Sequence, residues 1–214
     1  MELTYLAALI SFLALDTTAA FQMLVSSPLF TGPLLGWLLG DTMLGFEMGF
    51  LFQLLWLGKI PAGATFVPEG NIASMIATAL VLLNKELALP HTTLTLAFLE
   101  GILISYFGAV LTVLYRKANG KMLQITIAQI RKRHFRWIIF SEVASMVLYG
   151  LIFFGFTWMV LQINQQFLPH LIRIIGGMFE KQFVVARPAI LGIGVAFVLP
   201  LLKEAWKVVR KEWS

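Results

Sequence analysis

Apolar residues form seven runs along the chain, separated by short polar or proline-containing segments. The runs cover residues 3–24, 29–39, 43–57, 66–83, 91–115, 137–161 and 184–202. A helix needs about 20 such residues to cross a bilayer core of about 30 Å. The run 137–161 is apolar on every side except at Glu142, so it must face lipid or other helices. We therefore predict an all-α, polytopic membrane protein with five to six transmembrane helices.

Two of the first four runs are too short for a full crossing. Prolines at positions 28, 33, 61 and 68 break the apolar sequence at these places. Non-helical backbone is tolerated at membrane depth where protein or a water-filled cavity satisfies it, and many transporters build substrate sites from such breaks. We predict broken or re-entrant segments in the first half, within a single domain covering residues 1–214.

The composition is typical of a membrane protein and excludes functions that need cysteine. Hydrophobic residues make up 59% of the chain and charged residues 13%, and the mean hydropathy is +0.85. The chain has no cysteine, which excludes disulfides, thiolate metal sites and a phosphorylated cysteine. The sequence predicts no cofactor, no metal site and no catalytic residue.

The net charge of +5 arises mainly from two segments. Residues 116–136 contain seven Lys or Arg and no Asp or Glu, and residues 203–214 contain four more basic residues. Basic residues near span ends are retained in the cytoplasm and are attracted to anionic membrane lipid. We therefore predict a basic cytoplasmic loop at 116–136 and a basic cytoplasmic tail at 203–214, and no nucleic-acid partner.

Small residues recur at helical spacing near the N-terminal third. Gly32, Gly36 and Gly40 follow each other every four residues, and Gly45 and Gly49 form a second pair. Such faces let helix backbones approach closely. We expect the first face to be covered by a helix of another subunit. The second face, which continues into polar residues at both ends, is either a packing surface or the wall of a hydrophilic cavity.

Polar residues inside apolar sequence concentrate in the first 71 positions. A carboxylate in lipid costs roughly 2.5 to 3.5 kcal/mol unless it is paired or used. Carboxylates and amides together suit a sugar, whose hydroxyls both donate and accept hydrogen bonds, and they also suit a cation or proton relay. Structural roles are open as well. Asp41 could cap the following helix, and Glu69 could sit in a first helical turn. Glu100 and Glu142 could pair with basic residues or lie in helix contacts.

The order of these residues resembles one known family. The segment ALDTTAAFQMLVSSPLFTGPLLGWLLGD at 14–41, followed by QLLWLGKIPAGATFVPEGNIAS at 53–74, is similar to the mannose/fructose/sorbose-family IIC subunit of the bacterial sugar phosphotransferase system. The similarity covers residues 12 to 80 well and the remainder in hydropathy. Ser27, Gln53 and Glu69 differ from the residues most usual in the family.

This resemblance implies a function and a set of partners. It implies a sugar-translocating subunit in the bacterial inner (cytoplasmic) membrane that binds a hexose-type sugar and passes it inward by an elevator-like movement. It also implies pairing with a IID-like membrane subunit, oligomers of that pair, and phosphate delivery by a cytoplasmic IIA/IIB phosphocarrier. Carried over position by position, the predicted substrate-binding residues are Asp16, Gln22, Asp41, Gln53, Glu69 and Asn71.

Two other classes of protein fit the hydropathy. One is the substrate-binding membrane component of another small-molecule importer, such as a vitamin-capture subunit of six helices. The other is a membrane adaptor that transports nothing. Only the sugar-translocating IIC-type subunit accounts for the ordered motif, and we adopt it as the prediction. We further expect the Pro61–Gly63 turn to bring Gln53, Glu69 and Asn71 to one cavity.

Overall fold

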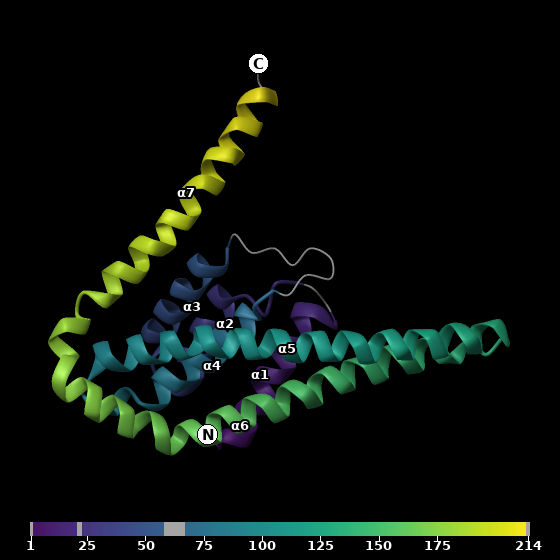
Figure 1. Cartoon of the computed structure of the whole chain (residues 1–214), viewed down its shortest axis with the longest axis horizontal. Coiled ribbons are helices and arrows are strands. Elements are labelled where there is room, and N and C mark those ends of the chain that lie inside the picture. The colour runs from purple at the N-terminus through teal and green to yellow at the C-terminus, as the bar shows by residue number, and fades with distance from the viewer. Residues whose placement is uncertain (1, 21–22, 58–66, 213–214) are drawn as a thin grey trace.

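The computed structural model describes residues 2–20, 23–57 and 67–212, and the regular elements within these ranges are all helices. Its α-helices are α1 (Leu3–Thr18), α2 (Pro28–Leu39), α3 (Thr42–Trp56), α4 (Gly70–Leu83), α5 (Pro90–Arg131), α6 (Arg136–Phe183) and α7 (Ala186–Glu212), with a short 3₁₀ turn η1 (Lys85–Leu87). Four short helices form a body beside a hairpin of two long ones (Figure 1). The predicted Gln22 and the turn at Pro61–Gly63 lie outside the described residues.

Helix α4 is the centre of the short-helix body. Every residue from 72 to 82 is buried, and α4 contacts α1, α2, α3, α5 and α6. Its sequence, GNIASMIATALVLL, is apolar or small on all sides, which is the composition of a helix enclosed by other helices. The residues that pack around it include Leu6 and Ile10 of α1 and Phe52 of α3.

Helices α2 and α3 form a short antiparallel hairpin whose contact is made of backbone. A methyl group at Gly36 would lie 2.8 Å from the Thr42 Cα atom, and one at Gly32 would lie 2.9 Å from the Gly49 Cα atom. Gly40 ends α2 with a φ of 82°, a conformation that glycine adopts without strain. The glycine face is therefore covered within the chain, and our expectation that another subunit covers it was wrong.

The glycine pattern led to a wrong partner because it indicates only that the backbone of some helix packs closely against the glycine face. An i, i+4 series of small residues does not say which helix is the neighbour. Here the neighbour is the next helix along the sequence, joined by the tight turn at Gly40 and Asp41. With 12 and 15 residues, α2 and α3 are each too short to cross a bilayer alone, which agrees with the predicted re-entrant segments.

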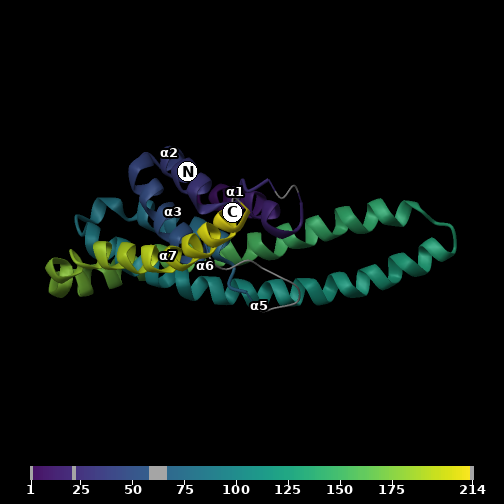
Figure 2. The same cartoon turned by 90° about the horizontal axis from the view of Figure 1, so that it is seen from above.

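Helices α5 and α6 form a long antiparallel hairpin that extends well beyond the body (Figure 2). The helices contain 42 and 48 residues, whereas a bilayer core needs about 20. Side-chain bonds fix their register: Asn119 donates to the Ser145 hydroxyl at 2.8 Å, and Asn164 donates to the Glu100 carboxylate. The predicted role of Glu100 in a helix contact is confirmed.

The basic segment 116–136 is mostly helix and not the loop we predicted. Helix α5 continues to Arg131, α6 starts at Arg136, and only residues 132–135 connect them. Charge clusters report the side of the membrane on which a segment lies, but they do not exclude helix, since Lys and Arg are good helix formers. The cytoplasmic location of this segment stays a prediction.

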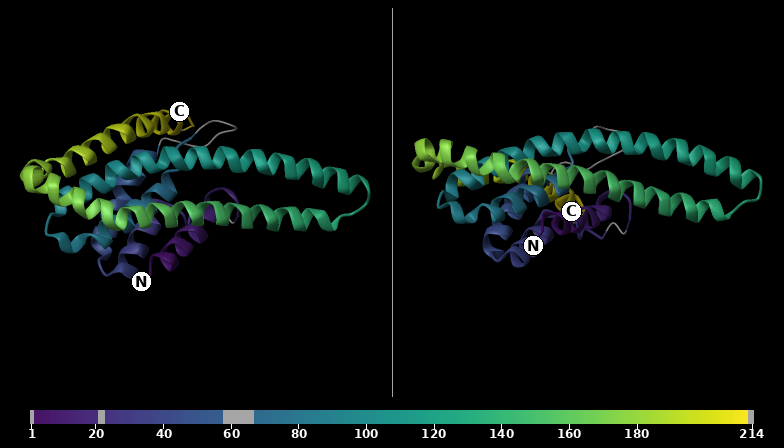
Figure 3. Two further views of the ribbon diagram at one scale, coloured as in Figure 1. Left: turned by 60° about the horizontal axis from the view of Figure 1, so that its bottom comes forward. Right: turned by 90° about the horizontal axis from the view of Figure 1, so that it is seen from below.

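Helix α7 leaves the end of α6 and runs back past the body (Figure 3). Three helical segments are long and apolar enough to cross a membrane: Pro90–Arg131, Arg136–Phe183 and Ala186–Lys207. The four remaining α-helices of the described chain are shorter and apolar. The chain is thus a polytopic, all-α membrane protein in which short helices pack against long spans.

Replacing Gly36 with alanine tests the backbone contact between α2 and α3. The new methyl group would meet main-chain atoms of residues 41 and 42, which cannot move as a flexible side chain can. We expect a loss of roughly 1 to 3 kcal/mol, seen as a lower thermal unfolding midpoint in detergent. Gly120→Ala is the matched control, because a methyl group there meets no described atom within 4 Å and should stabilise the helix slightly. Equal thermal unfolding midpoints for the two variants would show that the backbones of α2 and α3 are not in close contact at Gly36.

A cysteine at Gly120 tests the predicted cytoplasmic location of the basic segment 116–136. The chain has no natural cysteine, so a single introduced thiol is the only cysteine target for a maleimide in this protein. In intact cells Gly120→Cys should resist a membrane-impermeant maleimide and should react once the membrane is permeabilised, because positively charged segments are retained inside. Labelling in intact cells would place this segment outside.

Candidate functional site

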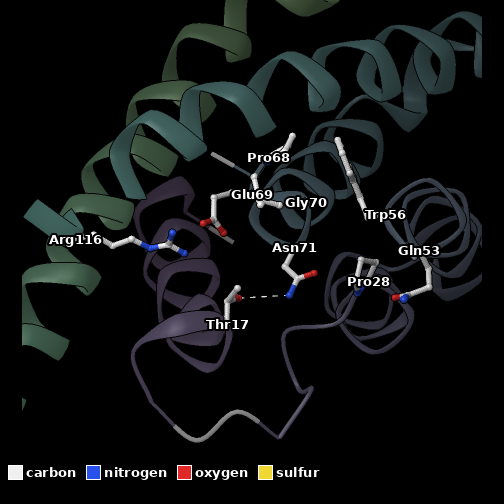
Figure 4. Close-up of a pocket in the computed structure, with 10 residues that line it drawn as sticks. Thr17, Pro28, Gln53, Trp56, Pro68, Glu69, Gly70, Asn71 and Arg116 are labelled. Atoms are coloured by element: carbon white, nitrogen blue, oxygen red, sulfur yellow. Dashed lines mark hydrogen bonds between the residues drawn. The ribbon is translucent and has the colours of Figure 1, made fainter. Parts of the chain in front are cut away.

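A polar cavity of about 140 Å³ lies where the ends of several elements meet. It lies beside the end of α1, the start of α2, the end of α3, the start of α4 and the middle of α5 (Figure 4). We name it the Glu69 cavity, and its lining residues are Thr17, Pro28, Gln53, Trp56, Val67, Pro68, Glu69, Gly70, Asn71 and Arg116. Gln53, Glu69 and Asn71 thus meet at one cavity, as the sequence predicted.

Glu69 is held by one face of α5. Its backbone N–H donates to the Ser105 carbonyl at 2.9 Å, and its carboxylate accepts from the Thr112 hydroxyl at 2.6 Å. A methyl group at Gly108 would lie 2.9 Å from the Glu69 Cβ atom, so a glycine is needed for this close approach. Arg116 lines the same cavity, and Figure 4 shows its guanidinium extending toward the Glu69 carboxylate.

The alternative role of Glu69 as a helix cap is only partly realised. Glu69 occupies the residue before the first turn of α4, but its side chain makes no capping hydrogen bond. The carboxylate instead points away from the helix start to Thr112 and is 8% exposed. A buried carboxylate of this kind is costly in an apolar region unless it has partners or a use.

Asn71 and Asp16 organise the neighbouring segment between α1 and α2. The Asn71 amide donates to the Ser26 hydroxyl at 3.0 Å and, more weakly, to Thr17 at 3.5 Å. The Asp16 carboxylate accepts from the backbone N–H groups of Met23 at 2.7 Å and Ser26 at 3.0 Å. Asp16 does not line the Glu69 cavity in this structure; it holds the segment that positions Ser26 against Asn71.

Gln53 and Trp56 supply the α3 wall of the cavity. The Gln53 side-chain oxygen is buried and has no hydrogen-bond partner among the described residues. An unpaired acceptor at a cavity wall is open to a donor from a ligand hydroxyl. The Trp56 indole lies directly against Gly70, where a methyl group would come within 2.6 Å of the ring.

Asp41 lies at the other end of α3, away from Gln53. Its carboxylate accepts from the Leu44 N–H at 2.9 Å, so the predicted cap of α3 is confirmed. Because α3 separates Asp41 from Gln53 by 12 residues, about 18 Å along the axis, the two cannot touch one small ligand. Asp41 lines a different cavity.

Two residues beside Glu69 were missed as site residues: Arg116, which lines the cavity, and Thr112, which donates to the Glu69 carboxylate. Thr112 carried no signal in an apolar run, and Arg116 was assigned to topology alone. The two residues can be related to Glu69 only when the packing of α5 is known. Ser105, Gly108, Thr112 and Arg116 follow each other at spacings of three and four, which places them on the one face of α5 that lies against Glu69. Polar and small residues at that spacing in a span are the available signal.

The fold and this cavity define a polytopic membrane protein with a small polar site between a body of short helices and a long hairpin. A family model described as "PTS system sorbose-specific iic component" matches residues 3–209, and the chain belongs to this family of membrane components of the sugar phosphotransferase system. No curated protein sequence matches the chain significantly.

Two solved structures share the fold. One, described as "Structure of membrane protein", has a TM-score of 0.70 and 21% identity, with 94% of this chain and 77% of that chain covered. The other is a cryo-EM structure of the mannose transporter ManYZ in complex with microcin E492, with a TM-score of 0.58, 19% identity and the same coverage.

The bond between Thr112 and Glu69 can be tested by removing one hydroxyl. Thr112→Val leaves the buried carboxylate without its donor, and we expect a loss of about 1 to 3 kcal/mol in stability. Thr126→Val on the same helix removes a hydroxyl that only bonds the Met122 carbonyl and should change stability by less than about 0.5 kcal/mol. Thermal unfolding of both variants in one detergent makes the comparison. Similar midpoints would mean that the Thr112 bond contributes nothing specific.

Proposed function

We propose that this chain is a sugar-translocating IIC subunit that binds a hexose-type sugar in the Glu69 cavity. The observation that carries the proposal is the meeting of Gln53, Glu69 and Asn71, from two separate helices, with Arg116 and Thr17 in one polar cavity. Sugar hydroxyls need acceptors and donors together, and this wall offers a carboxylate, two amides, a hydroxyl and a guanidinium.

The proposed transport step is inward passage across the bacterial cytoplasmic membrane, with phosphorylation by a separate IIA/IIB phosphocarrier. The chain itself supplies binding and orientation in this scheme. The site is divided between the short-helix body and α5, so a shift of the body against α5 would open or close it. Such a shift is the local event that an elevator-like movement requires.

We also propose that the chain works with a IID-like membrane subunit and in oligomers of that pair. One similar structure is of a transporter named with two components, ManYZ, which supports a paired arrangement. In addition, α7 exposes apolar side chains such as Ile193, Phe197 and Leu199, and lipid or another subunit must cover them.

Glu69→Gln tests the sugar site. A carboxylate that accepts sugar hydroxyls makes charge-assisted bonds of about 1.5 to 3 kcal/mol, so affinity should fall by roughly one to two decades. Binding is measured by calorimetry on the protein purified with its partner, using D-mannose, D-fructose and L-sorbose. The thermal midpoint of the same preparation reports whether the fold is intact.

Glu100→Gln is the matched control. Glu100 is also a carboxylate on a helix contact, paired with a neutral amide, but it does not line the Glu69 cavity. Its substitution should leave sugar affinity unchanged. If Glu69→Gln binds sugar like wild type and only melts at a lower temperature, Glu69 is a structural residue and the site assignment is wrong.

A further inference from the structure

A second polar cavity, of about 310 Å³, lies at the opposite end of the short-helix body. We name it the Arg187 cavity; its wall includes Asp41, Met43, Glu47, Lys85, Thr93 and Arg187. These residues come from the turn before α3, the first two turns of α3, the 3₁₀ turn, and the starts of α5 and α7. Its volume exceeds the 140 Å³ of the Glu69 cavity.

The two cavities lie at opposite ends of α3 and α4. Asp41 and Gln53 are 12 residues apart on α3, about 18 Å along its axis, which is less than the bilayer core of about 30 Å. Helices α3 and α4 each run from one cavity to the other, α3 from Asp41 to Trp56 and α4 from Glu69 toward Lys85. The cavities therefore lie at opposite ends of the short-helix body, and the predicted cytoplasmic location of the segment that contains Arg116 would put the Arg187 cavity toward the outer side.

The charges of the Arg187 cavity balance. Glu47 forms an ion pair with Arg187, while Asp41 accepts from the Leu44 N–H and Lys85 donates to the carbonyls of Leu39 at 2.9 Å and Gly40 at 3.2 Å. The Arg187 Nε atom is buried and has no hydrogen-bond partner among the described residues. Two carboxylates and two cations with no net charge suit a neutral ligand rich in hydroxyls better than a cation or an anion.

A purely structural role explains less of this cavity. The Glu47–Arg187 pair does tie α7 to α3, but apolar side chains could tie two membrane helices as well, without the cost of placing charges there. The charges of Asp41 and Lys85 are used in capping α3 and the end of α2, but neither cap requires a cavity of this size beside it. A recognition site accounts for the cavity together with the charges around it.

We propose that the Arg187 cavity is a second sugar-binding subsite, which receives the sugar on the membrane face opposite Arg116 before it reaches the Glu69 cavity. This inference rests on the proposed function. Sugar hydroxyls would donate hydrogen bonds to the Asp41 and Glu47 carboxylates. They would accept hydrogen bonds from Lys85 and from the unpaired Arg187 nitrogen. Asp41 then belongs to the sugar path at a different stage from Gln53, Glu69 and Asn71.

Site-directed labelling tests the subsite in the protein assembled with its partner. Met43 is at the rim of the cavity and 75% exposed, so Met43→Cys should react with an impermeant thiol reagent added outside intact cells. A bound sugar should block it: at about ten times the dissociation constant, labelling should slow by roughly tenfold. Glu86→Cys, exposed in the neighbouring turn but outside the cavity, should label at the same rate with and without sugar.

The two proposals fail in different ways. If calorimetry detects no binding of D-mannose, D-fructose or L-sorbose to the wild-type complex, the proposed function is wrong. If sugar binds there but does not slow labelling of Met43→Cys, the Arg187 cavity is not a subsite. Protection that persists in the Glu69→Gln background supports two separate subsites; protection that disappears with Glu69→Gln means one site only and overturns the inference.

A paired substitution separates recognition from tethering. Glu47→Gln combined with Arg187→Gln keeps a hydrogen-bonding pair between α3 and α7 but removes both charges. A subsite predicts that the KM for sugar uptake rises by roughly tenfold while the thermal midpoint stays close to that of wild type. An unchanged KM with a lower midpoint would show that the pair only holds α7 in place.

Discussion

The contact between α2 and α3 is made of main-chain atoms, and the placement of both cavities depends on it. Gly32 and Gly36 on one helix meet Gly45 and Gly49 on the other without intervening side chains. This closeness allows two helices of 12 and 15 residues to fold back on each other inside the apolar body. The polar ends of α3 are thereby held at two fixed places, one beside Glu69 and the other beside Arg187.

The short helices create a second requirement, since every helix end inside the protein leaves backbone groups that need partners. Asp41 accepts from the start of α3, Lys85 donates to the last carbonyls of α2, and the Ser105 carbonyl accepts from the residue before α4. The Glu180 carboxylate similarly accepts from the N–H groups of His91 and Thr92 at the start of α5. Capping groups and cavity residues are therefore partly the same residues.

Sequence reasoning identified the polar residues whose free-energy cost in an apolar run does not depend on how the chain folds. A carboxylate or amide in an apolar run is expensive wherever the chain folds, so Gln53, Glu69 and Asn71 could be identified without knowing their neighbours. The same reasoning could not pair Glu69 with Thr112, or Glu47 with Arg187 across 140 residues of sequence, because these depend on which helices pack together. It also mistook the basic segment 116–136 for a loop, since charge constrains the side of the membrane and leaves the backbone conformation free.

Helix α7 is attached to the rest of the protein near its beginning. The ion pair of Arg187 with Glu47 and the close approach of Gly194 to Leu54 both lie in its first nine residues, whereas most side chains beyond them are exposed. The remaining two thirds of the helix then behave as an arm whose angle is set by what surrounds it. For an arm of this kind, hydrophobic mismatch matters: a thinner membrane favours a larger tilt of its apolar segment, and a thicker one brings it upright. The angle between α7 and the body is thus a property of the bilayer as well as of the sequence.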